Sequence, residues 1–330
     1  MQSRRLQLKL VHGRLCLGLI FGLSLLIWVT FPSDPDHRRN LILRAGNILP
    51  FLGIPRDLAD YYGIAVKRPS FVHTKLSYLQ HRGYQDVKNP KLLCWITSYH
   101  GTRQRAAAVR HSWGQQCDKF LIMFPKFRDR TYNDEDVSLP VSYHYSALWN
   151  RTQLALLHLW EHFGTTYDFI LKADDDTMVN VTALRRFLHG FSPQDPLYMG
   201  HPLHIPTLGT YMSGGAGYTL SRRSFSLLIQ ALTKNSPAFF RDSLPEDAAL
   251  GLLLASVGAV LIATVDSQDR LMSIPVRMTH FEGTQVANWY TNANAAPMKD
   301  GTSHQRFQCC SDFMISQHYI SPEMMTKGTT

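Results

Sequence analysis

The sequence predicts an α/β fold in which a mostly parallel sheet carries helices on both faces, preceded by one transmembrane helix. Three observations support this prediction. From residue 89 onward, short apolar runs alternate with stretches of helical period. One uncharged run occupies residues 15–31. The segment between these two regions shows neither a helix nor a strand period. Strands that alternate with helices favour a parallel sheet, which binds ligands beyond the carboxyl ends of its strands.

The uncharged run at 15–31 (LCLGLIFGLSLLIWVTF) is just long enough for a helix to cross a thin bilayer. Basic residues without acids precede it, and charges balance after it, so the positive-inside rule places residues 1–14 in the cytosol. A cleaved signal peptide is the alternative, but the run exceeds a usual signal core and no small-residue cleavage site follows. We therefore predict a cytoplasmic tail, a signal-anchor at 15–31 and a lumenal remainder in the endoplasmic reticulum or Golgi.

Residues 32–88 mix Pro, Arg, His and Tyr without a sustained helix or strand period, which predicts a stem. Residues 89–330 then suffice for one lumenal domain, and sequons at Asn150 and Asn180 fit that location. The net charge is +9, yet 89–330 carry 21 basic and 20 acidic residues. This near balance argues against a nucleic-acid-binding surface on the domain.

The first two predicted strands, 92–97 (LLCWIT) and 119–124 (KFLIMF), are apolar runs typical of strands buried on both faces. A helix at 149–163 then repeats large apolar residues at helical spacing, and DFILK at 168–172 is another buried strand. The remaining elements continue the alternation: helix 181–188, strand 197–200, helices 225–232 and 248–257, and strand 259–265.

Four of the five cysteines lie beyond the apolar run, an even number for an oxidising compartment. Cys94 lies within one predicted strand and Cys117 just before the next, so a bridge between neighbouring strands is geometrically reasonable. Cys309 and Cys310 are adjacent, which permits a vicinal disulfide or two separate partners. Free buried thiols are the alternative for each cysteine.

Three consecutive carboxylates, Asp174, Asp175 and Asp176, directly follow strand 168–172. Clustered carboxylates repel one another unless a cation neutralises them. Such oxygen ligands suit Mn²⁺ or Mg²⁺, whose shell is often completed by substrate phosphates. The triplet is therefore a candidate metal site, with a solvated loop or a helix N-cap as the alternative.

The segment 211–218 (YMSGGAGY) lets the backbone approach a ligand closely, although a tight turn explains it as well. It lacks the Lys-Ser/Thr pair of a phosphate loop. Glu246 and Asp247 open the next helix, where the helix dipole favours a carboxylate in any protein. For one of these two acids to act as a general base, the pair must face the Asp triplet.

His318 is a candidate nitrogen ligand for the metal, or else a packed side chain beside an aromatic residue. Arg103, Arg105 and Arg110 flank the loop and helix after the first strand, a natural place for phosphate or ribose contacts. Solvated surface arginines are the alternative.

Six motifs stand in order along the chain: LLCWIT, RAAAVRHSWGQQC, ILKADDDTMV, YMSGGAGY, EDAALG and CCSD followed by SQHY. Together they resemble the core 1 β1,3-galactosyltransferases of glycosyltransferase family 31, over residues 92–319. The resemblance implies a Golgi type II membrane enzyme of GT-A fold. Such an enzyme transfers galactose from UDP-galactose to O3 of GalNAc on Ser or Thr of glycoproteins, with inversion and with Mn²⁺.

The resemblance also implies roles for single residues. The implied metal ligands are Asp174, Asp176 and His318, and the implied catalytic base is Asp247. Implied donor-binding residues are Thr97, Arg103, Arg110, Asp174 and Asp175. Implied acceptor-binding residues are Gly214, Gly215, Tyr218, Glu246, Trp289 and Tyr290. The implied disulfides are Cys94–Cys117 and Cys309–Cys310, and a homodimer is compatible with the family.

Two departures from the family pattern stand out. Residues 235–256 lack the cysteine pair that the family carries around the ED helix, which removes a covalent staple. Residues 291–297 (TNANAAP) lack the family's aromatics, which bears on acceptor preference. The alternatives are a β1,3-transferase with another donor or acceptor, such as UDP-GlcNAc or a glycolipid, and a non-catalytic client-binding chaperone. The clustered acids argue against the chaperone.

Overall fold

A computed structural model describes residues 72–83, 89–126, 136–205, 209–234, 244–278, 290 and 308–327. All of them lie within one compact unit, Asp57–Thr330. The predicted tail, membrane span and acceptor stretch 291–297 lie outside the described residues, as does Trp289. Among the helices that are described, none is long and apolar enough to span a bilayer.

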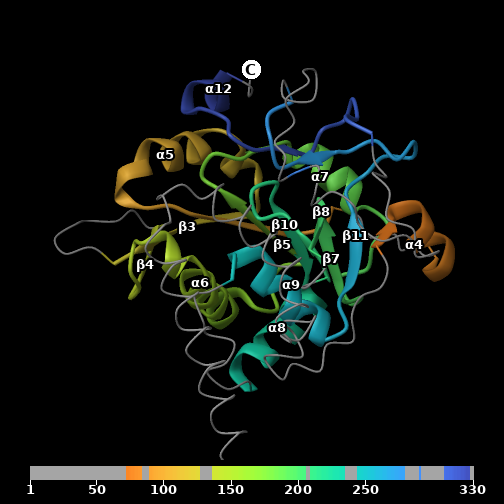
Figure 1. Cartoon of the computed structure of the whole chain (residues 1–330), viewed down its shortest axis with the longest axis horizontal. Coiled ribbons are helices and arrows are strands. Elements are labelled where there is room, and N and C mark those ends of the chain that lie inside the picture. The colour runs from red at the N-terminus through yellow and green to blue at the C-terminus, as the bar shows by residue number, and fades with distance from the viewer. Residues whose placement is uncertain are drawn as a thin grey trace, which may run out of the picture. The chain divides into compact units, whose positions relative to one another are not determined.

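An eight-stranded sheet forms the centre of this unit, with the strand order β1-β11-β7-β10-β5-β2-β3-β4 (Figure 1). Its strands are β1 (Val72–Thr74), β2 (Leu92–Thr97), β3 (Lys119–Pro125), β4 (Asp136–Leu139), β5 (Phe169–Asp174), β7 (Leu197–Gly200), β10 (Tyr218–Ser221) and β11 (Val260–Ala263). Strand β10 runs antiparallel to both of its neighbours, and the other pairings are parallel. The predicted α/β class with a mostly parallel sheet is therefore confirmed.

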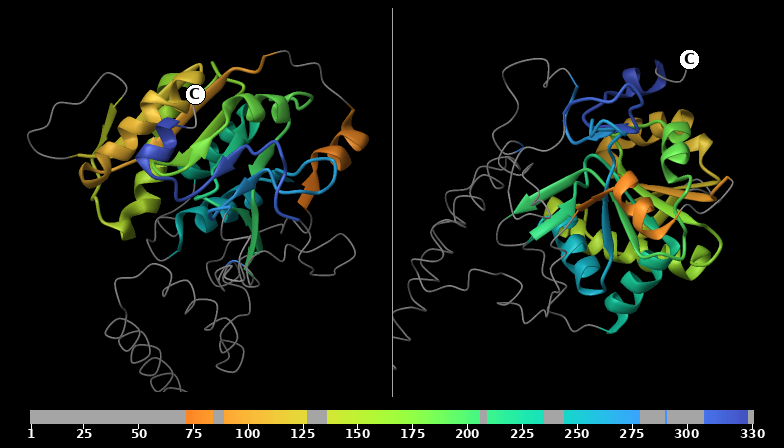
Figure 2. Two further views of the ribbon diagram at one scale, coloured as in Figure 1. Left: turned by 90° about the horizontal axis from the view of Figure 1, so that it is seen from above. Right: turned by 90° about the vertical axis from the view of Figure 1, so that its right-hand side faces the viewer.

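Helices cover both faces of the sheet (Figures 1 and 2). One face packs against α6 (Leu148–Phe163), α8 (Arg222–Lys234) and α9 (Glu246–Ser256). The other packs against α5 (Arg103–His111) and α7 (Val181–Leu188), and α12 (Pro322–Lys327) lies on α5. The molecule thus has two apolar cores, one on each side of the sheet.

Strand β2 shows why the buried strands read as unbroken apolar runs. Leu93 and Trp95 point into the core beneath α6, α8 and α9, whereas Leu92, Cys94 and Ile96 point into the opposite core. Successive side chains of a strand alternate between the faces, so both sets must be apolar when both faces are covered.

The structure corrects one part of the predicted stem. Residues 72–83 form β1 and the helix α4 (Lys75–Arg82), and β1 pairs with β11 at the edge of the sheet. A strand of three residues is too short to show a strand period, so the pattern gave no signal there. Thr74 caps α4, because its hydroxyl accepts the Ser77 N–H at 3.2 Å.

Both implied disulfides are present. Cys94 of β2 is bonded to Cys117, which precedes β3, and Cys309 is bonded to its neighbour Cys310. The first bridge joins two adjacent parallel strands at the end opposite the Asp triplet.

The two sequons lie at the starts of helices. Asn180 is exposed and caps α7, since its side-chain oxygen accepts the Ala183 N–H at 2.9 Å. Asn150 is half-buried in the first turn of α6. Exposure therefore favours Asn180 as the glycan acceptor.

Candidate functional site

The Asp triplet lies where β5 ends, at the carboxyl edge of the parallel strands. Asp174 is the last residue of β5 and stands opposite Thr97, the last residue of β2. This is the edge at which open α/β sheets bind ligands. Thr97 thus borders the triplet, as its predicted donor-binding role requires.

A short C-terminal strand carries His318 to the triplet. Strand β13 (Ser316–Gln317) pairs antiparallel with β6 (Met178–Val179), which directly follows the triplet. The Nε2 atom of His318 consequently lies 3.1 Å from Oδ1 of Asp176 and 3.7 Å from Oδ2 of Asp174. These two acids and the histidine form a cluster, the metal-site cluster.

The metal-site cluster fits a divalent cation. Its three candidate ligand atoms all lie within 4.8 Å of one another. The Nδ1 atom of His318 lies 3.2 Å from the Pro275 carbonyl, which can only accept, so a proton on Nδ1 would leave Nε2, the atom that faces both aspartates, to bind a cation. Two carboxylates and an imidazole are ligands that several divalent metals accept.

The glycine-rich segment 211–218 makes room for this histidine. A Cβ atom at Gly215 would overlap Nδ1 and Cε1 of His318. The carbonyl of Gly215 also accepts the Thr177 hydroxyl at 2.8 Å, which ties the segment to the residue after the triplet. The backbone of the segment therefore lies directly against His318 of the metal-site cluster.

Gly215→Ala is expected to weaken Mn²⁺ binding about 10-fold, because the added methyl group displaces His318 from the two aspartates. Mn²⁺ titration of the wild type, Gly215→Ala, His318→Ala and the double variant tests this. If displacement of His318 is the cause, the double variant binds no more weakly than His318→Ala alone. Additive losses would contradict the explanation.

Asp175 points away from the metal-site cluster. Its Oδ2 accepts the Ser98 hydroxyl at 2.8 Å, and burial raises its pKa to about 6 although hydrogen bonds from Thr102 and Ser98 oppose that shift. Burial also acts on Asp176, but bonding to His318 and the charge of Arg105 outweigh it and lower the Asp176 pKa. The described geometry thus separates Asp175 from the two metal-facing acids.

The three arginines after β2 take different partners. Nη1 of Arg105 lies 3.0 Å from Oδ2 of Asp176 and 3.8 Å from Asp175, and its side chain is 44% exposed. Arg103 lies with its guanidinium 5.4 Å from the centre of the Phe124 ring, and Arg110 pairs with Asp136. Arg105, for which the resemblance implies no role, thus contacts the triplet directly.

The ED pair begins α9 and is buried beside the triplet. Oε1 of Glu246 accepts the Tyr218 hydroxyl at 2.9 Å, and its Oε2 lies 3.6 Å from Nζ of Lys172. The same Nζ lies 2.6 Å from Oδ1 of Asp174. One ammonium therefore joins Glu246 of the ED pair to the triplet, which places the start of α9 beside the site.

Asp247 is held by backbone donors. Its Oδ2 accepts the Gly214 N–H and its Oδ1 the Ala248 N–H, both at 3.0 Å. A carboxylate has about four lone-pair positions, so these two bonds do not by themselves prevent Asp247 from taking a proton. Helix capping and a catalytic role are therefore compatible at this residue.

Burial and neighbouring charges set the protonation of the acids and the lysine. Burial raises the pKa of Glu246, although the charge of Lys172 opposes this. For Lys172 the charges of Asp174 and Glu246 outweigh the effect of burial, and its pKa is raised. The lysine is thus a permanent cation between two acids.

The predicted acceptor residues fall into two groups. Gly214, Tyr218 and Glu246 lie in the site, where Gly214 donates its N–H to Asp247 and Tyr218 donates its hydroxyl to Glu246. Tyr290 is fully buried, with its ring centre 5.5 Å from that of His201. Its acceptor-binding role stays a prediction.

His201 makes the domain sensitive to acid. Burial lowers its pKa to about 4 from 6.5, so it stays neutral in the folded state while the unfolded chain takes up a proton below pH 6.5. Stability should therefore fall as pH drops from 6.5 to 4, by roughly 3 kcal/mol in all. Urea unfolding at several pH values should show that the free energy of unfolding falls less toward low pH in His201→Gln than in the wild type. The glutamine amide can still donate to the Ser273 carbonyl. Parallel curves would contradict the assignment.

The comparisons with known proteins bear on this site. The Fringe-like family model matches residues 96–306. The chain belongs to this family. Membership confirms the resemblance to glycosyltransferase family 31, and the matched segment contains the triplet, the glycine-rich segment and the ED pair. His318 of this Fringe-like chain lies beyond the matched residues.

Two relatives share part of their length with this Fringe-like chain. Glycoprotein-N-acetylgalactosamine 3-beta-galactosyltransferase 1 of Xenopus laevis is 29% identical over 246 residues, which cover 72% of this chain and 65% of the relative. Beta-1,3-glucosyltransferase of Mus musculus is 23% identical over 194 residues, which cover 58% of this chain and 38% of the relative. The chain thus spans less than two thirds of either relative.

Among solved structures, a glycosyltransferase involved in the glycosylation of the major capsid of PBCV-1 matches with a TM-score of 0.37 and 14% identity, covering 52% of this chain and 81% of that one. The glycosyltransferase GlyE of Streptococcus pneumoniae matches with a TM-score of 0.32 and 12% identity, covering 53% and 45%.

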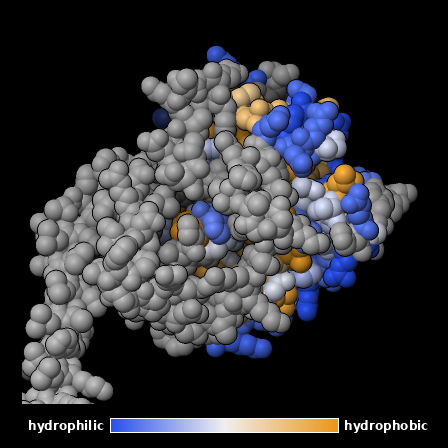
Figure 3. Space-filling view, turned by 45° about the vertical axis from the view of Figure 1, so that its right-hand side comes forward, coloured by the Kyte–Doolittle hydropathy of each residue, from blue (hydrophilic) through white to orange (hydrophobic). Residues whose placement is uncertain are grey.

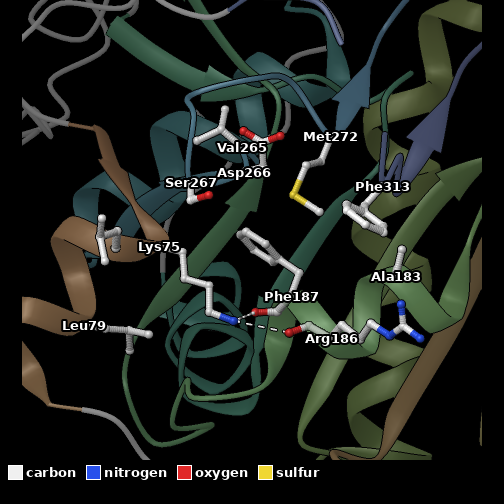
Figure 4. Close-up of a pocket in the computed structure, with 11 residues that line it drawn as sticks. Lys75, Leu79, Ala183, Arg186, Phe187, Val265, Asp266, Ser267, Met272 and Phe313 are labelled. Atoms are coloured by element: carbon white, nitrogen blue, oxygen red, sulfur yellow. Dashed lines mark hydrogen bonds between the residues drawn. The ribbon is translucent and has the colours of Figure 1, made fainter. Parts of the chain in front are cut away.

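A separate, mainly apolar cavity of about 440 Å³ lies between α4, α7 and the turn at 265–272 (Figure 4). Phe187, Met272 and Phe313 line it, and Nζ of Lys75 donates to the Phe187 carbonyl at 2.7 Å. On this side of the molecule, hydrophobic patches stand between hydrophilic ones (Figure 3). The acids of the triplet and the ED pair do not line the cavity, so it is distinct from the candidate site.

The sequence analysis did not identify Lys172 as a site residue. The feature that could have revealed it is a lysine within the apolar run FILKA, because burying an unpaired ammonium there would cost free energy.

Proposed function

We propose that this chain is a Mn²⁺-dependent, inverting β1,3-galactosyltransferase of GT-A fold. It transfers galactose from UDP-galactose to O3 of GalNAc-α-Ser or GalNAc-α-Thr on glycoproteins, which makes core 1. The observation that carries the proposal is that Lys172 joins the metal-site cluster and the ED pair into one site. The name of the Xenopus relative supports the linkage and the acceptor class.

Asp174, Asp176 and His318 would hold the cation, whose positive charge stabilises the diphosphate leaving group when it is bound. Arg105 lies half-exposed at the triplet and can contact the same diphosphate. Asp247 takes the proton from the attacking hydroxyl. Direct displacement from the face opposite the leaving group inverts the anomeric centre, so no residue has to serve as a covalent nucleophile.

We further propose that the protein resides in the Golgi membrane as a single-pass type II protein with residues 15–31 as its anchor and a lumenal catalytic domain. The uncharged run, the basic residues before it and the Cys94–Cys117 bridge support this location, since disulfides persist in oxidising compartments.

Product formation by the purified full-length chain tests the function. UDP-galactose, a GalNAc-α-Thr peptide and Mn²⁺ should give a β1,3-linked product that EDTA abolishes. Parallel reactions with UDP-glucose, UDP-GlcNAc and a glycolipid acceptor test the second candidate, another donor or acceptor, which the name of the mouse relative favours. A folded chain that binds no UDP would support the chaperone alternative instead.

A further inference from the structure

Lys172 is an ammonium group inside the sheet. Only 1% of its surface is exposed, and its neighbours in β5, Leu171 and Ala173, are buried and apolar. Its Nζ lies 5.7 Å from the centre of the Tyr218 ring on β10, the residue opposite it in the strand pair. Burying such a charge costs several kcal/mol unless acids compensate it, so its partners determine what it does.

Those partners come from two separate motifs. Oδ1 of Asp174 lies 2.6 Å from Nζ, and Oε2 of Glu246 lies 3.6 Å from it. The second oxygen of each acid has another partner: Oδ2 of Asp174 faces Nε2 of His318 at 3.7 Å, and Oε1 of Glu246 accepts the Tyr218 hydroxyl. The carboxylate of Asp174 is therefore shared between Lys172 on one side and the metal-site cluster on the other.

We propose that Lys172 is a positioning residue: it binds one oxygen of Asp174 so that the other faces the metal, and it anchors Glu246, beside the base, to the same point. The inference deepens the proposed function and rests on it, since it takes Asp174 as a metal ligand. Partners behind a metal ligand commonly orient it and are worth about 10–100-fold in metal affinity.

Two physical effects of Lys172 on a metal oppose each other. Its charge repels a cation, whereas its hydrogen bond fixes the direction of Asp174. Because Asp174 and Glu246 already offset the ammonium charge, orientation is the larger effect, and loss of Lys172 weakens metal binding. Repulsion as the dominant effect would give tighter binding, so the sign of the change decides the question.

The test measures Mn²⁺ affinity of the full chain by electron paramagnetic resonance without nucleotide. Lys172→Met is expected to bind Mn²⁺ about 10-fold more weakly than the wild type. Lys172→Met combined with Glu246→Gln removes both buried charges, so it should regain thermal stability that Lys172→Met loses while its Mn²⁺ affinity stays low. A role in stability alone would restore both together.

Equal or tighter Mn²⁺ binding by Lys172→Met, or recovery of affinity in the double variant, would overturn the proposal. Should Lys172→Met fail to fold, the double variant alone decides, through the same affinity. Failure of the proposed function looks different: the wild type itself then binds no Mn²⁺, or binds it and makes no glycosylated product.

Discussion

Asp247→Asn is expected to lower turnover by about three orders of magnitude, because an amide cannot take the proton of the attacking hydroxyl. Metal-dependent UDP binding should persist, since Asp247 does not belong to the metal-site cluster. Asp247 instead accepts the N–H groups of Gly214 and Ala248. Initial rates and UDP titrations on the same preparation separate the two effects.

The control for this variant is Asp312→Asn, which changes an acid whose side chain is 76% exposed and paired with Arg270. Its turnover and UDP affinity should match the wild type. Thermal unfolding of both variants shows whether the amide disturbs the Gly214 contact. Wild-type turnover in Asp247→Asn would remove Asp247 from the role of base and leave helix capping as its function.

Asp176→Asn is expected to weaken Mn²⁺-dependent UDP binding about 100-fold, since even the outer partners of a metal are worth 10–100-fold. The variant keeps the size of the side chain but removes the charge that lies 3.1 Å from His318 and 3.0 Å from Arg105. UDP titration at fixed Mn²⁺, and again in EDTA, measures the metal-dependent part.

Asp175→Asn is the matched control, because its carboxylate bonds Ser98 and lies outside the metal-site cluster. Its Mn²⁺ affinity without nucleotide should stay within about 3-fold of the wild type. Equal losses of Mn²⁺ affinity without nucleotide in Asp175→Asn and Asp176→Asn would show that total negative charge, rather than ligand geometry, holds the cation.

Much of the fold could be predicted because it depends on local pattern. The strand Leu92–Thr97 and the helix Val181–Leu188 occur at the predicted residues. Each buries many apolar side chains, and their pattern along the sequence indicates the type of element. Short or edge elements escaped: β1 has three residues and joins the sheet only through β11. The antiparallel direction of β10 likewise depends on the path by which the chain returns to the sheet. The local sequence pattern does not indicate that path.

The site divides in the same way. The sequence by itself determined the Asp triplet at a strand end and the acidic start of α9, because consecutive residues carry those chemistries. Only the tertiary structure decided that His318 reaches the triplet through the pairing of β13 with β6, that Lys172 joins Asp174 to Glu246, and that Tyr290 is buried. The contacts of His318 with the triplet and of Lys172 with Glu246 join residues far apart in the chain, and strand pairing and close packing, rather than spacing along the sequence, bring them together.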